Sequence, residues 1–256
     1  MSGSAGHEGE VRLIVRADDF GMAHAVNEAI CRAHQEGIVT ITSTMAPCPW
    51  FNEAAALASR HGIPVGVHQT LTCEWDWYRW GPITSGPSLT GSDGTFRRTI
   101  DEAAAAMEHE DAVTELLAQV DRFGAAGLRP QYLDHHMGSA VPDAYAEVSE
   151  RTGIPFLYGP AVDLDGFFEL TPREAEGKKA WLLDLLAGLR PGVHMVVCHP
   201  GVAGPELASL TEPDSEPWPW AEHWRVADLA VVTDPEVRAA VVELGIRLCS
   251  LSDALD

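Results

Sequence analysis

Two adjacent aspartates, Asp18 and Asp19, follow an apolar run that begins at Val11 and is rich in β-branched residues. Such a run is typical of a buried strand. A buried strand end does not hold two carboxylates without a compensating charge. The pair therefore indicates a polar site, with a cation nearby, at the carboxyl end of a first core strand. The alternative is a local role, because aspartate is also common at helix N-caps and in Asx turns.

Histidines stand at the ends of three later apolar runs: His68 in 63–70, His135 and His136 directly after 130–134, and His199 directly after 193–198. A carboxylate and two imidazoles form a ligand set for a divalent ion that keeps open positions. Such an ion acidifies a bound water, and a second carboxylate can take the proton of that water. Spacing alone does not choose between His135 and His136 as the ligand.

The elements that must position these groups alternate along the chain. The apolar runs predict strands at 11–18, 38–46, 63–70, 130–134, 154–158, 193–198 and 246–250. Helical spacing predicts helices at about 24–36, 51–61, 101–126, 143–152, 176–189 and 234–244. This alternation is typical of a parallel sheet with helices outside, and about seven units favour a closed or nearly closed β/α barrel. A barrel brings the carboxyl ends of its strands together, so the histidines are expected to converge on Asp18 and Asp19.

Two segments, 71–98 and 200–227, interrupt the alternation and hold six of the eight tryptophans. These are Trp75, Trp77, Trp80, Trp218, Trp220 and Trp224. Each segment follows a predicted strand at the end where such barrels bind their substrates. Aromatic rings in this position can stack on sugar faces. Alternatively, they pack on each other as part of a lid or an interface.

The composition limits the classes of partner. A formal net charge of −21 disfavours nucleic acid, anionic membranes and polyanionic substrates, and fits a neutral small molecule. We find no apolar run near the ~20 residues that a membrane span needs. Five scattered cysteines without a CxxC pair suggest reduced thiols in a cytoplasmic protein. Residues 1–10 read as a disordered leader and 11–256 as a single domain.

Several stretches together resemble a known family, the YdjC-like carbohydrate deacetylases. They are Ala17-Asp18-Asp19-Phe20-Gly21, the segment 37–44, Gly66-Val67-His68, Leu133-Asp134-His135-His136 and Cys198-His199-Pro200, in the same order as in the family. The resemblance spans nearly the whole chain. It implies a distorted or incomplete (β/α) barrel with about seven parallel core strands. It also implies metal-dependent removal of acetyl groups from N-acetylated sugars.

The resemblance also implies roles for individual residues. Asp19 and His68 match metal ligands of the family, and Asp18 then matches the general base. The family segment after Leu-Asp commonly reads Ser-His-His-His-Val-His, whereas 135–140 here reads His-His-Met-Gly-Ser-Ala. Alignment on Leu-Asp makes His136 the third ligand and places His135 in the serine position. The later histidines of the motif are absent, which marks a divergent branch.

The same resemblance also implies roles for His199 and for Asp134 with its neighbour His135. His199 would protonate the leaving amine or hold the oxyanion. Asp134, with His135 beside it, would lie next to the metal ligands without binding the metal, and Asp134 would accept a hydrogen bond that orients an imidazole. Alternation along the first strand predicts that Asp19 points into the barrel on the same face as Leu13, Val15 and Ala17. Asp18 would then depend on the turn at Phe20-Gly21 to reach the water.

The expected cofactor is one divalent ion, zinc or magnesium, and the expected partner is a small N-acetylated sugar, with a homodimer possible. Two imidazoles favour zinc, and a shell richer in carboxylates and water would suit magnesium. Two other functions remain open. One is hydrolysis of a different amide or an ester on the same fold, and the other is sugar binding without catalysis.

Overall fold

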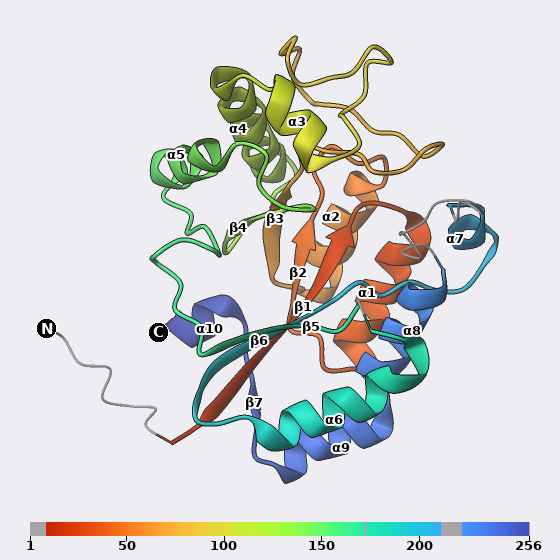
Figure 1. The fold of residues 1–256 in the computed structure, drawn as a ribbon. Helices are drawn as coiled ribbons and strands as arrows, with labels where there is room; N and C mark the ends of the chain where they lie inside the picture. The colour runs from red at the N-terminus through yellow and green to blue at the C-terminus, as the bar shows by residue number, and fades with distance from the viewer. Residues whose placement is uncertain (1–8, 172, 211–221, 256) are drawn as a thin grey trace, which may run out of the picture.

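The structure, a computed structural model, describes residues 9–171, 173–210 and 222–255. One seven-stranded sheet lies at its centre, with helices around it (Figure 1). The strands are β1 (Val11–Phe20), β2 (Ile41–Thr44), β3 (Val65–Gln69), β4 (Leu133–His135), β5 (Gly166–Glu169), β6 (Gly192–Cys198) and β7 (Arg247–Leu248). The helices are α1 (His24–Glu36), α2 (Phe51–His61), α3 (Ile100–Ala106), α4 (His109–Ala125), α5 (Pro142–Thr152), α6 (Lys178–Gly188), α7 (Pro205–Leu210), α8 (His223–Val232), α9 (Pro235–Glu243) and α10 (Leu251–Leu255).

All neighbouring strands are parallel, in the order β4-β3-β2-β1-β6-β5. Strand β1 is central: β6 pairs along most of one side, whereas β7 and β2 share the other side, β7 beside Arg12 and β2 from Arg16 onward. The edge strands β4 and β5 are not paired with each other. The fold is therefore an incomplete, distorted parallel barrel, which confirms the predicted fold class.

The two faces of β1 contact different parts of the core. Leu13, Val15 and Ala17 belong to the large apolar cluster shared with α1 and α2. Ile14 belongs to a second cluster inside the curled sheet, together with Met195 of β6. The interior face of β1 thus runs from Ile14 through Arg16 to Asp18, because side chains alternate along a strand. The interior is apolar at its base and becomes polar toward the carboxyl ends of the strands.

The prediction of a strand at 154–158 is wrong. The segment makes one parallel bridge, between Phe156 and Leu133, and the hydrogen bonds stop there. Pro155 has no N–H to donate, so it cannot extend the ladder. The fifth strand is instead β5 at 166–169, a Gly-Phe-Phe-Glu segment that the apolar pattern did not indicate.

The predicted helix at 101–126 is two helices. A capping box of Thr99 and Glu102 begins α3, which ends before Met107. The backbone of Met107 is extended, and its side chain is buried in the core. Core packing at this residue breaks a helical pattern that contains neither proline nor glycine between the two helices.

The described part of the second tryptophan-rich segment contains α7 and the start of α8. Glu206 of α7 caps α1 by accepting hydrogen bonds from the backbone N–H groups of His24 and Ala25. Trp218 and Trp220 lie outside the described residues, as do residues 1–8 of the predicted leader. Glu10 already accepts a backbone hydrogen bond from Gly192, so sheet pairing starts within the predicted leader.

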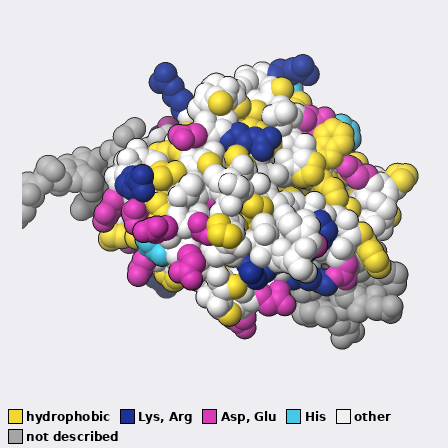
Figure 2. Space-filling view, turned by 90° about the horizontal axis from the view of Figure 1, so that it is seen from above, with side chains coloured by type: hydrophobic (Ala, Val, Ile, Leu, Met, Phe, Trp, Pro, Cys, Tyr) yellow, Lys and Arg dark blue, Asp and Glu magenta, His cyan; other side chains and the backbone are white. Residues whose placement is uncertain are grey.

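The face drawn in Figure 2 carries both signs of charge. Lys and Arg side chains stand there singly among Asp and Glu, rather than in one basic patch. Among the residues that the structure describes, no helix combines the length and the apolar character needed to cross a membrane.

Candidate metal centre and active site

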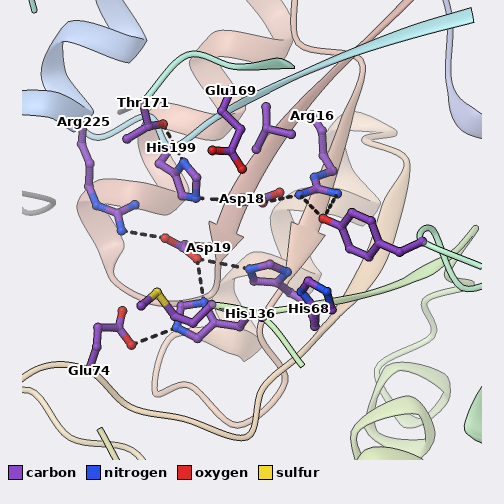
Figure 3. A pocket seen from close by; sticks show the side chains of 15 residues that line it. Arg16, Asp18, Asp19, His68, Glu74, His136, Glu169, Thr171, His199 and Arg225 are labelled. Carbon is purple, nitrogen blue, oxygen red and sulfur yellow. Dashed lines mark hydrogen bonds and ion pairs between the residues drawn. The ribbon is translucent and has the colours of Figure 1, made fainter. Parts of the chain in front are cut away.

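A pocket of about 330 Å³ opens at the carboxyl ends of β1, β3, β4, β5 and β6 (Figure 3). Its walls contain all five side chains that were predicted as metal ligands or catalytic groups: Asp18, Asp19, His68, His136 and His199. These residues come from four strand ends that are far apart in the chain. The parallel barrel brings them together, as expected for this class of fold.

Three of these side chains surround one point. The Oδ1 atom of Asp19 lies 3.5 Å from Nε2 of His68 and 3.4 Å from Nδ1 of His136. Ligands held ~2.0–2.1 Å from one tetrahedral ion lie about 3.3–3.4 Å from each other. The Asp19 Oδ1 atom is buried and accepts no hydrogen bond. An unsatisfied carboxylate oxygen that faces two ring nitrogens fits a divalent cation.

The backbone brings Asp19 to this position in an unexpected way. The face of β1 that bears Leu13, Val15 and Ala17 contacts the helices, so the prediction that alternation turns Asp19 inward with them is wrong. Asp19 instead has φ of +70°, and the register with β2 shifts between Ala17 and Phe20. The side chain of Asp18 points into the interior by ordinary strand alternation. The side chain of Asp19 points inward because its own backbone is left-handed.

The turn after Asp19 is fixed by tertiary contacts. Gly21 has φ of +95°, a conformation that glycine adopts without strain. Its N–H donates to Oδ1 of Asn27, whose own amide donates to the backbone oxygen of Trp50 and to Glu53. The helix that follows β1 thereby holds the end of the strand that carries the two aspartates.

Each of the three candidate ligands has a second, oppositely charged partner. Nδ1 of His68 lies 2.9 Å from Asp134, and Nε2 of His136 lies 2.9 Å from Glu74. Arg225 of α8 places Nη2 2.6 Å from Oδ2 of Asp19, which leaves Oδ1 to the pocket. Such partners fix the orientation of ligands and the tautomer of imidazoles.

These partners determine the protonation of the centre. Burial alone would raise the pKa of Asp19, but the charge of Arg225 and the neighbouring imidazoles of His136 and His68 hold it well below its usual value. Burial would lower the pKa of His68, yet the carboxylates of Asp134 and Asp18 raise it to about 10. Glu74 and Asp19 likewise outweigh burial and raise the pKa of His136 to about 9. Without a metal, both imidazoles are protonated on both ring nitrogens and positively charged at neutral pH.

Asp18 and His199 form the opposite side of the pocket. Arg16 binds Oδ2 of Asp18 at 2.7 Å and Oδ2 of Asp134 at 3.0 Å, so a single guanidinium ties the two carboxylates together. Oδ1 of Asp18 is buried and accepts no hydrogen bond. Nε2 of His199 lies 4.0 Å from Oδ2 of Asp18. A base and a proton donor can occupy these two positions.

His199 differs from the two candidate ligand histidines. Burial lowers its pKa below the ordinary 6.5, and the charges of Asp19 and Asp18 offset this only in part. At neutral pH its imidazole is therefore uncharged. Its Nδ1 atom lies 2.7 Å from the hydroxyl oxygen of Thr171, which follows β5.

The remaining predicted site residues differ in where they lie, and His135 also lines the pocket. The ring of His135 stacks on Tyr158 at 4.4 Å, and the described contacts include no hydrogen bond from it to a ligand. Trp75 and Trp80 are 5% and 3% exposed and belong to the core, whereas Trp77 is 72% exposed. None of these three tryptophans is among the described residues that line the pocket. The indole N–H of Trp80 donates to the backbone oxygen of Thr72, which ties its loop to the core.

Sequence reasoning missed six polar residues of the pocket wall: Arg16, Glu74, Tyr158, Glu169, Thr171 and Arg225. Arg16 carried a signal, because a cation in the middle of a buried strand needs an anionic partner. Glu74 and Arg225 lie in the two tryptophan-rich segments, where no periodicity indicates which side chain turns inward.

Comparisons with known proteins place these observations in a family. The sequence profile of a family described as YdjC-like protein matches residues 12–243. A carbohydrate deacetylase from Geobacillus stearothermophilus is 32% identical over 260 residues, which cover 92% of this chain and 94% of that protein. A chitooligosaccharide deacetylase from Yersinia pestis (strain Pestoides F) is 29% identical over 267 residues, or 95% and 99% of the two chains.

Two solved structures show the same fold. A protein described as a candidate for cellobiose-phosphate cleavage, from Enterococcus faecalis V583, aligns with a TM-score of 0.79 and 24% identity over 95% of this chain and 98% of its own. A family 4 carbohydrate esterase from Streptomyces lividans, in complex with acetate, aligns with a TM-score of 0.53 and 11% identity over 97% of each chain. The profile match and the sequence relatives carry the assignment, and on their evidence this chain belongs to the YdjC-like family.

Proposed function

We propose that this protein is a metal-dependent hydrolase that removes an acetyl group from an N-acetylated sugar or oligosaccharide. The observation that carries the proposal is the buried, unsatisfied Oδ1 of Asp19 between His68 and His136. The deacetylase names of the two sequence relatives support the substrate class.

Asp19, His68 and His136 would hold the metal, and two imidazole nitrogens with one carboxylate oxygen favour zinc over magnesium. When bound, a divalent ion there would polarise the acetyl carbonyl and acidify a water. Asp134, Glu74 and Arg225 keep the three side chains oriented toward the same point.

Asp18 is the proposed general base. Its Oδ1 atom has no hydrogen-bond partner, so it can take a proton from the water that attacks the acetyl carbon. Arg16 holds the other oxygen at 2.7 Å, which fixes the orientation of the carboxylate.

His199 is the proposed proton donor to the leaving nitrogen. As the C–N bond breaks, the amine needs one proton, and the attacking water has given one proton to Asp18. Nε2 of His199, 4.0 Å from Asp18, lies where it can pass that proton on. Water and amide become acetic acid and a neutral amine, and the two side chains return to their starting charges.

Contacts with the rest of the sugar belong to the same proposal. Among the three tryptophans of 71–98, only the exposed Trp77 offers a free face for stacking, and Trp218 and Trp220 remain candidates outside the described residues. All five cysteines are free and buried, which supports a reducing, cytoplasmic environment. A homodimer remains a prediction from the sequence.

The decisive experiment couples metal analysis to acetate release. The purified protein is stripped with a chelator, reconstituted with zinc or magnesium, and assayed against N-acetylated mono- and oligosaccharides and against acetyl esters. We expect one bound ion per chain, acetate release from at least one N-acetylated sugar, and loss of activity in the stripped protein. The control variant Asp121→Asn changes an exposed carboxylate of α4 that does not line the pocket, and should behave as wild type.

Each alternative predicts a different outcome. Release of acetate from esters alone would replace the proposal with an esterase of the same fold. Sugar binding without acetate release at full metal occupancy would indicate a binding protein. Activity that survives complete metal removal would contradict metal dependence.

A further inference from the structure

Behind His199 lies an ion pair with no exposure to solvent. Lys178 at the start of α6 and Asp228 of α8 are both 0% exposed, and the ammonium contacts Oδ1 of the carboxylate. Removing two charges from water is costly, and an apolar pair of similar size is often as stable. A fully buried pair next to a reactive pocket therefore calls for a role beyond stability.

Asp228 is surrounded by donors. Its Oδ2 atom accepts hydrogen bonds from the Thr171 hydroxyl at 2.6 Å and from the backbone N–H of His199 at 2.8 Å. Lys178 satisfies Oδ1 and also donates to the backbone oxygen of Trp224 at 3.3 Å. Paired with the ammonium of Lys178, the Asp228 carboxylate acts only as an acceptor, because a carboxylate has no proton to donate.

Counting protons then fixes the state of His199. The Thr171 hydroxyl has a single proton, and Asp228 takes it. The same hydroxyl oxygen lies 2.7 Å from Nδ1 of His199, so it must accept a hydrogen bond there. The neutral imidazole consequently carries its proton on Nδ1, and its Nε2 atom presents a lone pair toward Asp18.

We propose that Thr171 and Asp228, with Lys178 as the buried counter-charge, are positioning residues that hold His199 in the Nδ1–H tautomer with Nε2 facing the pocket. This role in catalysis rests on the proposed function, whereas the tautomer itself does not. Because the hydroxyl link is neutral, it orients the ring without forcing a charge on it. An imidazole held in this way can gain and lose a proton at Nε2.

Nitrogen NMR tests the tautomer directly. Protein labelled with ¹⁵N-histidine is measured near pH 8, where an ordinary imidazole is neutral, with and without zinc, and the His199→Gln variant assigns the signal. We expect wild-type His199 to show the Nδ1–H pattern. Thr171→Val removes the acceptor and should mix the tautomers, and Thr171→Ser should restore the wild-type pattern.

Kinetics test the consequence with the same variants. Thr171→Val should lower kcat about 10- to 100-fold, part of the ~10²–10⁴-fold that a positioned acid or base contributes, with little change in KM. Thr171→Ser should recover most of this loss. Thr152→Val is the control, since it removes a threonine hydroxyl from α5 that donates only to backbone oxygens, and it should leave both the spectrum and kcat unchanged.

Asp228→Asn gives a second, opposite test. With its oxygen kept on Lys178, the amide turns its NH2 toward Thr171 and gives up the hydrogen bond from the backbone N–H of His199. The hydroxyl is then free to donate to Nδ1 of His199, which reverses the tautomer. If the unpaired Lys178 prevents this variant from folding, the Thr171 series carries the test alone.

Separate results overturn the two proposals. An Nε2–H pattern in wild-type His199, or a Thr171→Val protein with wild-type spectrum and kcat, contradicts the positioning role. A wild type that shows the Nδ1–H pattern but releases no acetate from any acetylated sugar contradicts the proposed function and leaves the tautomer assignment standing.

Discussion

The two sides of the pocket hold their imidazoles by different means. On the candidate metal side, His68 and His136 are each bound to a carboxylate, and both pKa values are raised. On the opposite side, His199 is bound to a hydroxyl, and burial lowers its pKa. The difference fits the proposed tasks: a ligand must keep one orientation and bring electron density to a cation, whereas a proton donor must change its charge within each turnover.

The largest effect should come from removing a candidate ligand. His68→Ala or His136→Ala deletes one of three metal contacts, so metal content should fall and activity should drop by more than the ~10²–10⁴-fold that loss of one acid–base group costs. Elemental analysis of the purified variants measures the metal directly. Unchanged metal content in both variants would contradict the ligand assignment.

Asp18→Asn should separate the two sides. The amide keeps the size of the side chain but cannot take a proton, so kcat should fall about 10²–10⁴-fold. Asp18 is not among the proposed ligands, and metal content should stay at the wild-type value. Full turnover in this variant would remove Asp18 as the base, and loss of the ion would assign it to the metal side instead.

The raised pKa values predict a steep pH dependence of metal binding. In the metal-free protein, His136 with a pKa of about 9 and His68 with a pKa of about 10 are both protonated below pH 8. A bound ion requires both to be neutral, so binding should release two protons and affinity should fall about 100-fold for each pH unit lowered. Calorimetry with zinc between pH 6 and 8, in buffers of different ionisation enthalpy, counts these protons. Binding that is independent of pH and buffer would show that the imidazoles do not coordinate.

Glu74→Gln should give the smallest effect of the four. It removes the charge behind His136 but leaves a side chain of the same shape, so metal affinity should fall about 10- to 100-fold. The exposed Glu28 of α1 provides the matched control, and Glu28→Gln should bind metal like wild type. Equal affinity in the two variants would mean that Glu74 does not support the ligand.

The parts of the fold that were predicted correctly carry strong local patterns. The run 11–18 forms most of β1, from its first residue. The proline and early acid after Asp234 mark the start of α9. Strand β5 was missed because four residues with a glycine and two half-exposed rings have no distinctive period. The break between α3 and α4 was missed because the buried side chain of Met107 decides it.

The residues of the site likewise fall into those that could be predicted from the sequence and those that could not. Side chains at strand ends could be predicted, because a parallel sheet gathers its carboxyl ends whatever lies between them. Arg225 could not, since it reaches Asp19 across 206 positions from within the second tryptophan-rich segment, whose sequence has no clear period. Asp19 points into the barrel as predicted, but the stated reason, strict alternation, is wrong: its positive φ, supported by the Gly21 and Asn27 contact, turns it there.

The left-handed backbone of Asp19 limits how this centre can be redesigned. With φ of +70°, position 19 favours aspartate, asparagine or glycine, and disfavours longer or β-branched side chains. A protein engineer who wants a softer or harder ligand set therefore has little freedom here, because the substitution Asp19→Glu would keep the carboxylate but strain the backbone. Metal preference should be adjusted at 68 and 136, which lie in or beside regular strands, while position 19 is kept as a fixed anchor of the design.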